Sequence, residues 1–258
     1  MYLQCGYHAE VTDVALLTPT TVAVATNSNS VRVINFETRD STLLSGHTDI
    51  VLCLCVLPNR TAIATSSKDA TIRIWSTVTR QVVTVLTGHV EAVTALCCCP
   101  SSNVLYSASV DLTLKAWDLR KFFKSLEKGA KDAVCRTLYT VKAHDKDING
   151  LAISPNGIIL ASASQDKSVK MWAASDGKLL HACAGHKRGV WCVAFSTVDR
   201  ILASGGGGQQ HSYMELGYRR VHQIPSGLTL PAFVFPPKSH LIFFVFCRRR
   251  RRWCAWRS

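Results

Sequence analysis

The 258-residue sequence lacks the patterns of metal and nucleotide sites, although it contains 11 cysteines and 15 glycines. No two of its cysteines stand in a C-x-x-C pair, which excludes a zinc cluster of the usual spacing. The glycine run at residues 205–208 is not followed by the Gly-Lys-Ser/Thr of a phosphate-binding loop. The sequence therefore predicts no metal, no cofactor and no small-molecule substrate.

Long apolar runs are also missing. The run at residues 241–247 is far shorter than the roughly 20 residues that a membrane helix needs. The first ten residues have neither the basic region nor the apolar core of a signal peptide. Cysteines such as Cys53 and Cys55 stand in apolar segments, which favours buried, reduced thiols in a cytosolic or nuclear protein. We therefore expect no contact with a membrane.

Acidic residues are scarce at the C-terminal end. Residues 1–207 contain 21 basic and 16 acidic residues, whereas residues 208–258 contain 9 basic residues and one acidic residue. The formal net charge of +13 is therefore weak evidence that the first 207 residues bind nucleic acid. Five arginines at residues 248–252 resemble a nuclear-localisation or nucleic-acid patch, or are an accidental feature of the tail.

A repeated pattern occupies most of the chain. A histidine that follows a small residue recurs at His47, His89, His144 and His186. The first three are followed, at constant spacings, by an aspartate and a tryptophan: Asp69 and Trp75, Asp111 and Trp117, Asp166 and Trp172. A period slightly above forty residues with these landmarks is typical of WD-repeat propeller blades, each built from four short strands.

The repeats predict an all-β fold, an incomplete WD-repeat β-propeller within residues 1–204. We expect four blades, which begin near His8, His47, His89 and His144, and then two strands of a fifth. The N-terminal repeat is irregular, as terminal repeats commonly are.

The fifth repeat begins at His186 and then departs from the pattern. Gly208 and Met214 stand where an aspartate and a tryptophan are expected. Residues 205–258 show no blade periodicity, so we predict an unstructured, non-propeller C-terminal tail. From this abrupt change we predict that the residues after about 205 are translated from another reading frame or from an unspliced intron. The expected result is a truncated product with an unpaired sheet edge at residues 190–204.

Each regular repeat combines a histidine, a hydroxyl residue, an aspartate and a tryptophan. The three sets are His47, Thr65, Asp69 and Trp75; His89, Ser107, Asp111 and Trp117; and His144, Ser162, Asp166 and Trp172. One such set would suggest Ser-His-Asp catalysis, but a catalytic triad occurs once, in a pocket. Three copies at one spacing predict a structural network of buried polar groups in a protein that is not an enzyme.

Two further groups of residues are candidates for binding. Lys68, Val110 and Gln165 each precede a turn aspartate, where blades present side chains at one rim, and are candidate partner contacts. An insertion of thirteen residues before the outer strand of the third repeat carries Lys121, Lys124, Lys128 and Lys131. These lysines are candidate RNA contacts, and the alternative is a charge-rich, solvated surface loop.

Five strings go beyond the general repeat. They are YHAEVTD at residues 7–13, VATNS at 24–28, SGHTDIVL at 45–52, HDKDIN at 144–149 and GHKRGVWC at 185–192. In these strings the sequence resembles the transducin-beta-like WD-repeat proteins of the small-subunit processome, over residues 7–204. HDKDIN is the most specific, because the general repeat does not specify those residues. The resembling region is similar to the opening of that family's second propeller.

The resemblance implies a non-enzymatic scaffold in the nucleolus. Family members have two propellers and a C-terminal helical domain, and they work with other WD-repeat processome proteins. They associate with the small nucleolar RNA particle and with pre-ribosomal RNA, directly or through partners, during pre-18S rRNA processing. Because this chain lacks the first propeller and part of the second, we expect a product without the family's full function. The blade pattern alone also permits a WD-repeat adaptor of another complex, such as a ubiquitin-ligase substrate receptor or a signalling scaffold.

Overall fold

The computed structural model describes residues 10–99, 101–127, 135–197, 201–207, 211–215 and 220–223. Within these ranges the regular structure consists of β-strands, one α-helix and one short 3-10 helix. None of the helices in these ranges is long and apolar enough to cross a membrane.

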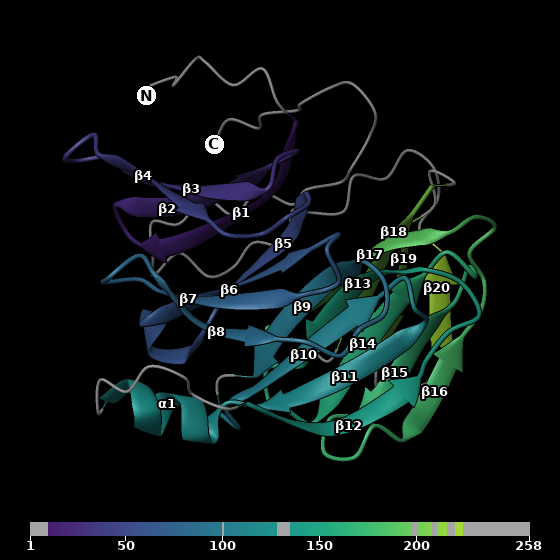
Figure 1. The fold of residues 1–258 in the computed structure, drawn as a ribbon. Coiled ribbons are helices and arrows are strands. Elements are labelled where there is room, and N and C mark those ends of the chain that lie inside the picture. The colour runs from purple at the N-terminus through teal and green to yellow at the C-terminus, as the bar shows by residue number, and fades with distance from the viewer. Residues whose placement is uncertain are drawn as a thin grey trace.

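The strands form five antiparallel sheets, each made of four strands that follow one another in the chain (Figure 1). The first sheet contains β1 (Val11–Thr18), β2 (Thr21–Thr26), β3 (Ser30–Asn35) and β4 (Ser41–Ser45). The second contains β5 (Val51–Val56), β6 (Ala62–Ser67), β7 (Ile72–Ser76) and β8 (Val82–Leu86). The third contains β9 (Val93–Cys99), β10 (Val104–Ser109), β11 (Thr113–Asp118) and β12 (Arg136–Lys142). The fourth contains β13 (Ile148–Ile153), β14 (Ile159–Ser164), β15 (Val169–Ala173) and β16 (Leu179–Cys183).

The sheets follow one another around an arc, from the purple first sheet to the green and yellow fifth sheet in Figure 1. The first strand of each sheet is innermost, since these strands contact one another in chain order: β1, β5, β9, β13 and then β17 (Val190–Phe195). The described chain is therefore an incomplete β-propeller, as the repeats predict.

The second blade shows why its residues form this unit. β5 is an apolar run that suits an inner strand, and β6 is buried along its whole length. A 3-10 turn, η1 (Pro58–Arg60), joins β5 to β6. Ala70 has a φ of 63° in the tight turn from β6 to β7, directly after Asp69. Leu112 and Lys167 take the same left-handed conformation at the equivalent turns, so the repeat fixes the turn geometry as well as the strands.

Neighbouring blades pack small residues of one sheet against large residues of the next. Ala64 of the second blade lies in one buried cluster with Leu105 and Trp117 of the third. Ala116 of the third blade lies in one cluster with Trp172 of the fourth. The repeated geometry of the arc thus depends on apolar interfaces between successive sheets.

The fifth sheet has four strands, so the expectation of two strands and an unpaired edge at residues 190–204 is wrong. β17 pairs with β18 (Ile201–Gly206), β18 with β19 (His211–Glu215), and β19 with β20 (Arg220–Gln223). Strand pairing uses backbone hydrogen bonds, which do not require the missing aspartate and tryptophan. A tail without structure from residue 205 is accordingly a wrong expectation for residues 205–207, 211–215 and 220–223.

The rest of the tail, including the arginines at 248–252, lies outside the described residues. Its origin in another reading frame or an intron stays a prediction, as does the domain limit at residue 204.

The insertion in the third repeat contains α1 (Arg120–Glu127), which comes between β11 and β12 in chain order and lies beyond one end of the sheet (Figure 1). Phe122 is fully buried in the cluster that also contains Leu57 and Leu119. Its ring meets that of Phe123 edge to face, with the centroids 5.3 Å apart. The described part of the insertion, α1, is therefore a docked helix with an apolar face.

Candidate functional site

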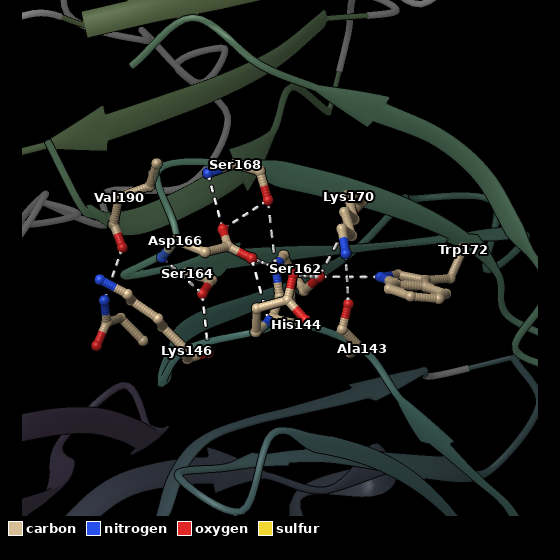
Figure 2. A network of polar contacts seen from close by, with 12 residues as sticks. Ala143, His144, Lys146, Ser162, Ser164, Asp166, Ser168, Lys170, Trp172 and Val190 are labelled. Atoms are coloured by element: carbon tan, nitrogen blue, oxygen red, sulfur yellow. Dashed lines mark hydrogen bonds and ion pairs between the residues drawn. The ribbon is translucent and has the colours of Figure 1, made fainter. Parts of the chain in front are cut away.

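The fourth blade shows the repeated polar network in full (Figure 2). His144 lies in the loop before β13, with its Nδ1 2.7 Å from Asp166 Oδ2 and its Nε2 2.7 Å from Ser162 Oγ. The indole N–H of Trp172 donates to the same Ser162 oxygen at 2.9 Å. The network therefore ties the loop before the inner strand to β14, to β15 and to the turn between them.

The second and third blades repeat this geometry. In the second, His47 Nδ1 is 2.8 Å from Asp69 Oδ2, His47 Nε2 is 2.7 Å from Thr65 Oγ1, and Trp75 Nε1 donates to Thr65 Oγ1 at 2.9 Å. In the third, His89 is 2.8 Å from both Asp111 Oδ2 and Ser107 Oγ, and Trp117 Nε1 donates to Ser107 Oγ at 2.9 Å. The structure thus brings the twelve predicted residues together in three groups of four.

Burial and hydrogen bonding set the protonation states of each group. Burial lowers the pKa of His144, and the nearby Asp166 offsets this only in part. Burial alone would raise the pKa of Asp166, but hydrogen bonds from Ser168 and His144 lower it to about 2. The neutral ring then donates through Nδ1 to the carboxylate and accepts at Nε2 from the Ser162 hydroxyl. Burial also lowers the pKa of His47 and of His89.

The hydroxyl groups that accept from the tryptophans are buried and hold neighbouring strands together. Thr65, Ser107 and Ser162 are fully buried, and each oxygen already accepts an indole N–H. A nucleophilic hydroxyl must reach a substrate, and these three do not reach the surface. Among the described residues, no group of three or more His, Cys, Asp and Glu side chains could hold a metal ion.

Two more hydroxyl positions take part in the network, and the sequence prediction missed both. Ser164 Oγ donates to the Lys146 carbonyl at 2.9 Å and accepts the Asp166 backbone N–H at 3.1 Å. Ser168 Oγ donates to Asp166 Oδ1 at 2.6 Å (Figure 2). The equivalent residues are Ser67 and Thr71 in the second blade and Ser109 and Thr113 in the third. Their signal in the sequence is a hydroxyl residue two positions before and two after each aspartate.

The first and fifth repeats depart from the full set of four residues. His186 Nε2 lies 2.8 Å from Ser204 Oγ, but Met214 replaces the tryptophan. In the first blade Ile34 stands at the tryptophan position, and His8 lies outside the described residues. The complete sets therefore belong to the three middle blades.

The rim candidates occupy equivalent turns between the second and third strands of their blades. The backbone N–H groups of Lys68, Val110 and Gln165 donate to the carbonyls of Ile50, Ala92 and Asp147, each at 2.9 Å. The Lys68 side chain is exposed, and those of Val110 and Gln165 are half-buried. Gln165 lies against Gly189 of the fifth blade, since a Cβ added to Gly189 would clash with Gln165 Oε1. The three side chains thus lie at one end of the blades, and their part in binding stays a prediction.

Two of the four lysines proposed for RNA contact lie on α1. Lys121 and Lys124 are exposed, whereas Lys128 and Lys131 lie outside the described residues. Arg120 adds a further charge at the helix start and pairs with Asp118 at 2.7 Å. Because α1 follows the third strand and the rim turns follow the second, antiparallel pairing places the helix and the rim at opposite ends of the blades. The two candidate surfaces are therefore separate.

Comparison with known proteins supports the repeat assignment. The family model described as WD domain, G-beta repeat matches residues 39–76, 80–118, 135–173 and 177–209. Transducin beta-like protein 3 of Homo sapiens is 39% identical over 196 residues, which cover 73% of this chain and 24% of that protein. U3 small nucleolar RNA-associated protein 13 of Saccharomyces cerevisiae is 34% identical over 206 residues, which cover 73% of this chain and 25% of that protein.

A shorter match links the chain to WD repeat and SOCS box-containing protein 1 of Xenopus tropicalis, 34% identical over 76 residues, or 29% of this chain and 18% of that protein. The chain spans about a quarter of the length of the transducin-like and U3-associated relatives. The repeat model matches more than half of the chain, and the four-stranded blades have the geometry that it implies. The chain belongs to the WD domain, G-beta repeat family.

Proposed function

We propose that this chain is a non-enzymatic WD-repeat scaffold of the small-subunit processome that supports pre-18S rRNA processing in the nucleolus. The observation that carries the proposal is the similarity to transducin beta-like protein 3 and to U3 small nucleolar RNA-associated protein 13, over 73% of the chain in each case. The name of the yeast protein associates it with U3 small nucleolar RNA. The relative with a SOCS box matches only 29% of the chain, which gives the ubiquitin-ligase adaptor less support.

Within this proposal the two ends of the blades have different partners. The rim at Lys68, Val110 and Gln165 binds other WD-repeat processome proteins, since equivalent turns repeat the same presentation around the arc. The exposed lysines of α1, Lys121 and Lys124, contact RNA phosphates, for which exposed ammonium groups are suited. The described chain has a complete four-stranded fifth sheet in place of two strands, which favours partner binding by the chain itself.

Affinity purification of the tagged chain from cells tests the proposal. We expect recovery of U3 small nucleolar RNA, pre-ribosomal RNA and other WD-repeat processome proteins. A rim variant, Lys68→Glu with Gln165→Ala, should lose the proteins, and a helix variant, Lys121→Glu with Lys124→Glu, should lose the direct RNA contact after ultraviolet crosslinking. A charge-matched variant of two exposed lysines that belong to neither the rim positions nor α1, Lys142→Glu at the end of β12 with Lys178→Glu in the turn between β15 and β16, should behave as the unmodified chain.

Recovery of cullin-type ligase subunits without these RNAs would overturn the scaffold proposal in favour of the adaptor. Equal loss of RNA in the helix variant and in its charge-matched control would overturn the assignment of α1.

A further inference from the structure

Three of the four blade interfaces of the described chain share a polar contact at the inner strands. Each inner strand has a bulge after its first residue, so that one side chain projects from the regular pairing. At three interfaces this side chain donates to the carbonyl of the first residue of the next inner strand. These contacts are Thr12 to Val51 at 2.9 Å, Thr94 to Ile148, and Asn149 to Val190 at 2.8 Å. At the remaining interface the bulge residue is Leu52, which has no polar side-chain atom.

The same interfaces share an apolar contact between two kinds of face. We call the face that packs on the preceding blade the leading face, and the face that packs on the following blade the trailing face. Leading faces carry larger residues such as Leu54, Leu96 and Val193, whose exposed fractions are 7%, 7% and 9%. Trailing faces carry small residues such as Ala64 and Ala161, both fully buried.

The two ends of the arc expose one face of each kind. By strand register, Val14 of the first blade is equivalent to Leu54, yet it is 37% exposed. At the other end, Ala203 of the fifth blade is equivalent to the buried Ala64 and is half-buried. Trp191, the bulge residue of the fifth blade, is 40% exposed. The first blade therefore presents a leading face, and the fifth blade presents a trailing face.

We infer that these two faces bind each other between copies of the chain. The trailing face of the fifth blade in one copy receives the leading face of the first blade in a second copy. Val14 and Val22 then pack on Ala194 and Ala203, as larger residues pack on small ones at the internal interfaces. Trp191 occupies the bulge position that supplies the donor at three internal interfaces, and its indole carries an N–H. Val11 is the first residue of its inner strand, the position that supplies the acceptor carbonyl. The contact thus continues an interface that the arc already uses.

Both partners of this contact are open in the described arc. Closure of the five blades on themselves would cover Val14 and Trp191 within one molecule, whereas both are exposed. The contact joins different surfaces of the two copies, so it is heterologous and leaves one face of each kind free at the ends of the dimer.

Two complementary variants test this head-to-tail association by mass measurement in solution. Val14→Asp disables the leading face, and Trp191→Asp disables the trailing face, because each would bury an unpaired charge. The unmodified chain should gain mass as its concentration rises, and each variant alone should remain a monomer. An equimolar mixture of the two variants should form a dimer and nothing larger, since each variant retains the face that the other lacks.

A matched control is Val78→Asp, at an 84% exposed position in the loop between β7 and β8, which should associate as the unmodified chain does. Circular dichroism and thermal melts establish that each variant is folded. A chain that is monomeric at every concentration, a mixture that remains monomeric, or equal disruption by the control would each overturn the inference.

Discussion

Removal of the Asp166 carboxylate should destabilise the fourth blade strongly. Its Oδ2 is 2.7 Å from His144 Nδ1, and its Oδ1 accepts the hydroxyl of Ser168 at 2.6 Å and the backbone N–H of Ser168 at 2.9 Å. The Asp166→Ala substitution leaves the buried imidazole N–H with only the Ser168 hydroxyl, 3.3 Å from Nδ1, as an acceptor. Loss of the carboxylate acceptor costs about 1–3 kcal/mol, and the substitution also removes hydrogen bonds to a charged group. The carboxylate is 13% exposed, so water replaces part of the loss.

The expected decrease in the free energy of unfolding is on the order of 2–4 kcal/mol. At about 2–4 °C per kcal/mol for a protein of this size, the midpoint of the thermal melt should fall by roughly 4–16 °C. The control is Asp145→Ala, which removes an exposed carboxylate next to the same histidine and should change stability by less than about 0.5 kcal/mol. A melt of Asp166→Ala that matches the unmodified chain would refute the structural role of the network.

Three other outcomes test the packing, the electrostatics and the thiols. Phe122→Ala should lower the free energy of unfolding in chemical denaturation by about 3–5 kcal/mol, because it removes a fully buried side chain of α1. Substitution of the exposed Lys124 by alanine should lower it by less than about 0.5 kcal/mol. Equal denaturation midpoints for the two variants would contradict the docking of the helix. Buried neutral histidines such as His144 bind fewer protons in the folded chain than in the unfolded chain. The stability that His144 contributes should therefore be complete above 6.5, the ordinary pKa of histidine, and should decline as the pH falls below it. The stability that Asp166 contributes should decline below 3.8, the ordinary pKa of aspartate, as the carboxylate becomes protonated near its pKa of about 2. A urea midpoint that does not change across both pH ranges would contradict these assignments. Burial raises the pKa of the Cys55 thiol to about 12, so alkylation at about pH 8 should be far slower in the folded chain than in the unfolded chain, and rapid labelling of the folded chain would refute its burial.

The sequence predicts the blades well because their signals are local and repeated. His144, Ser162, Asp166 and Trp172 recur with their equivalents at fixed spacings, and the spacing alone assigns each residue to a loop, a strand or a turn. The structure places each set within hydrogen-bonding distance. Repetition also separates structure from catalysis, since the same four residues stand in three blades.

Features that depend on pairing geometry could not be predicted from the same pattern. The strands β19 and β20 pair through their backbones, so the sequence has no side-chain pattern that predicts them. Thr12, Thr94 and Asn149 bridge neighbouring blades because a bulge turns each side chain toward the next inner strand, and a bulge is defined only by register. The docking of α1 depends on Phe122, which is fully buried. The sequence alone does not show which side of the helix faces the blades.

The scaffold proposal is tested most directly by lysine crosslinking and mass spectrometry on the chain purified from cells. Lys68 is exposed at the rim, so it should crosslink to other WD-repeat proteins of the small-subunit processome. Lys178, exposed in the turn between β15 and β16 at the opposite end of the blades, serves as the reference for crosslinks that do not depend on the rim. Crosslinks from Lys68 to cullin-type ligase subunits, or processome crosslinks no more frequent from Lys68 than from Lys178, would contradict the account.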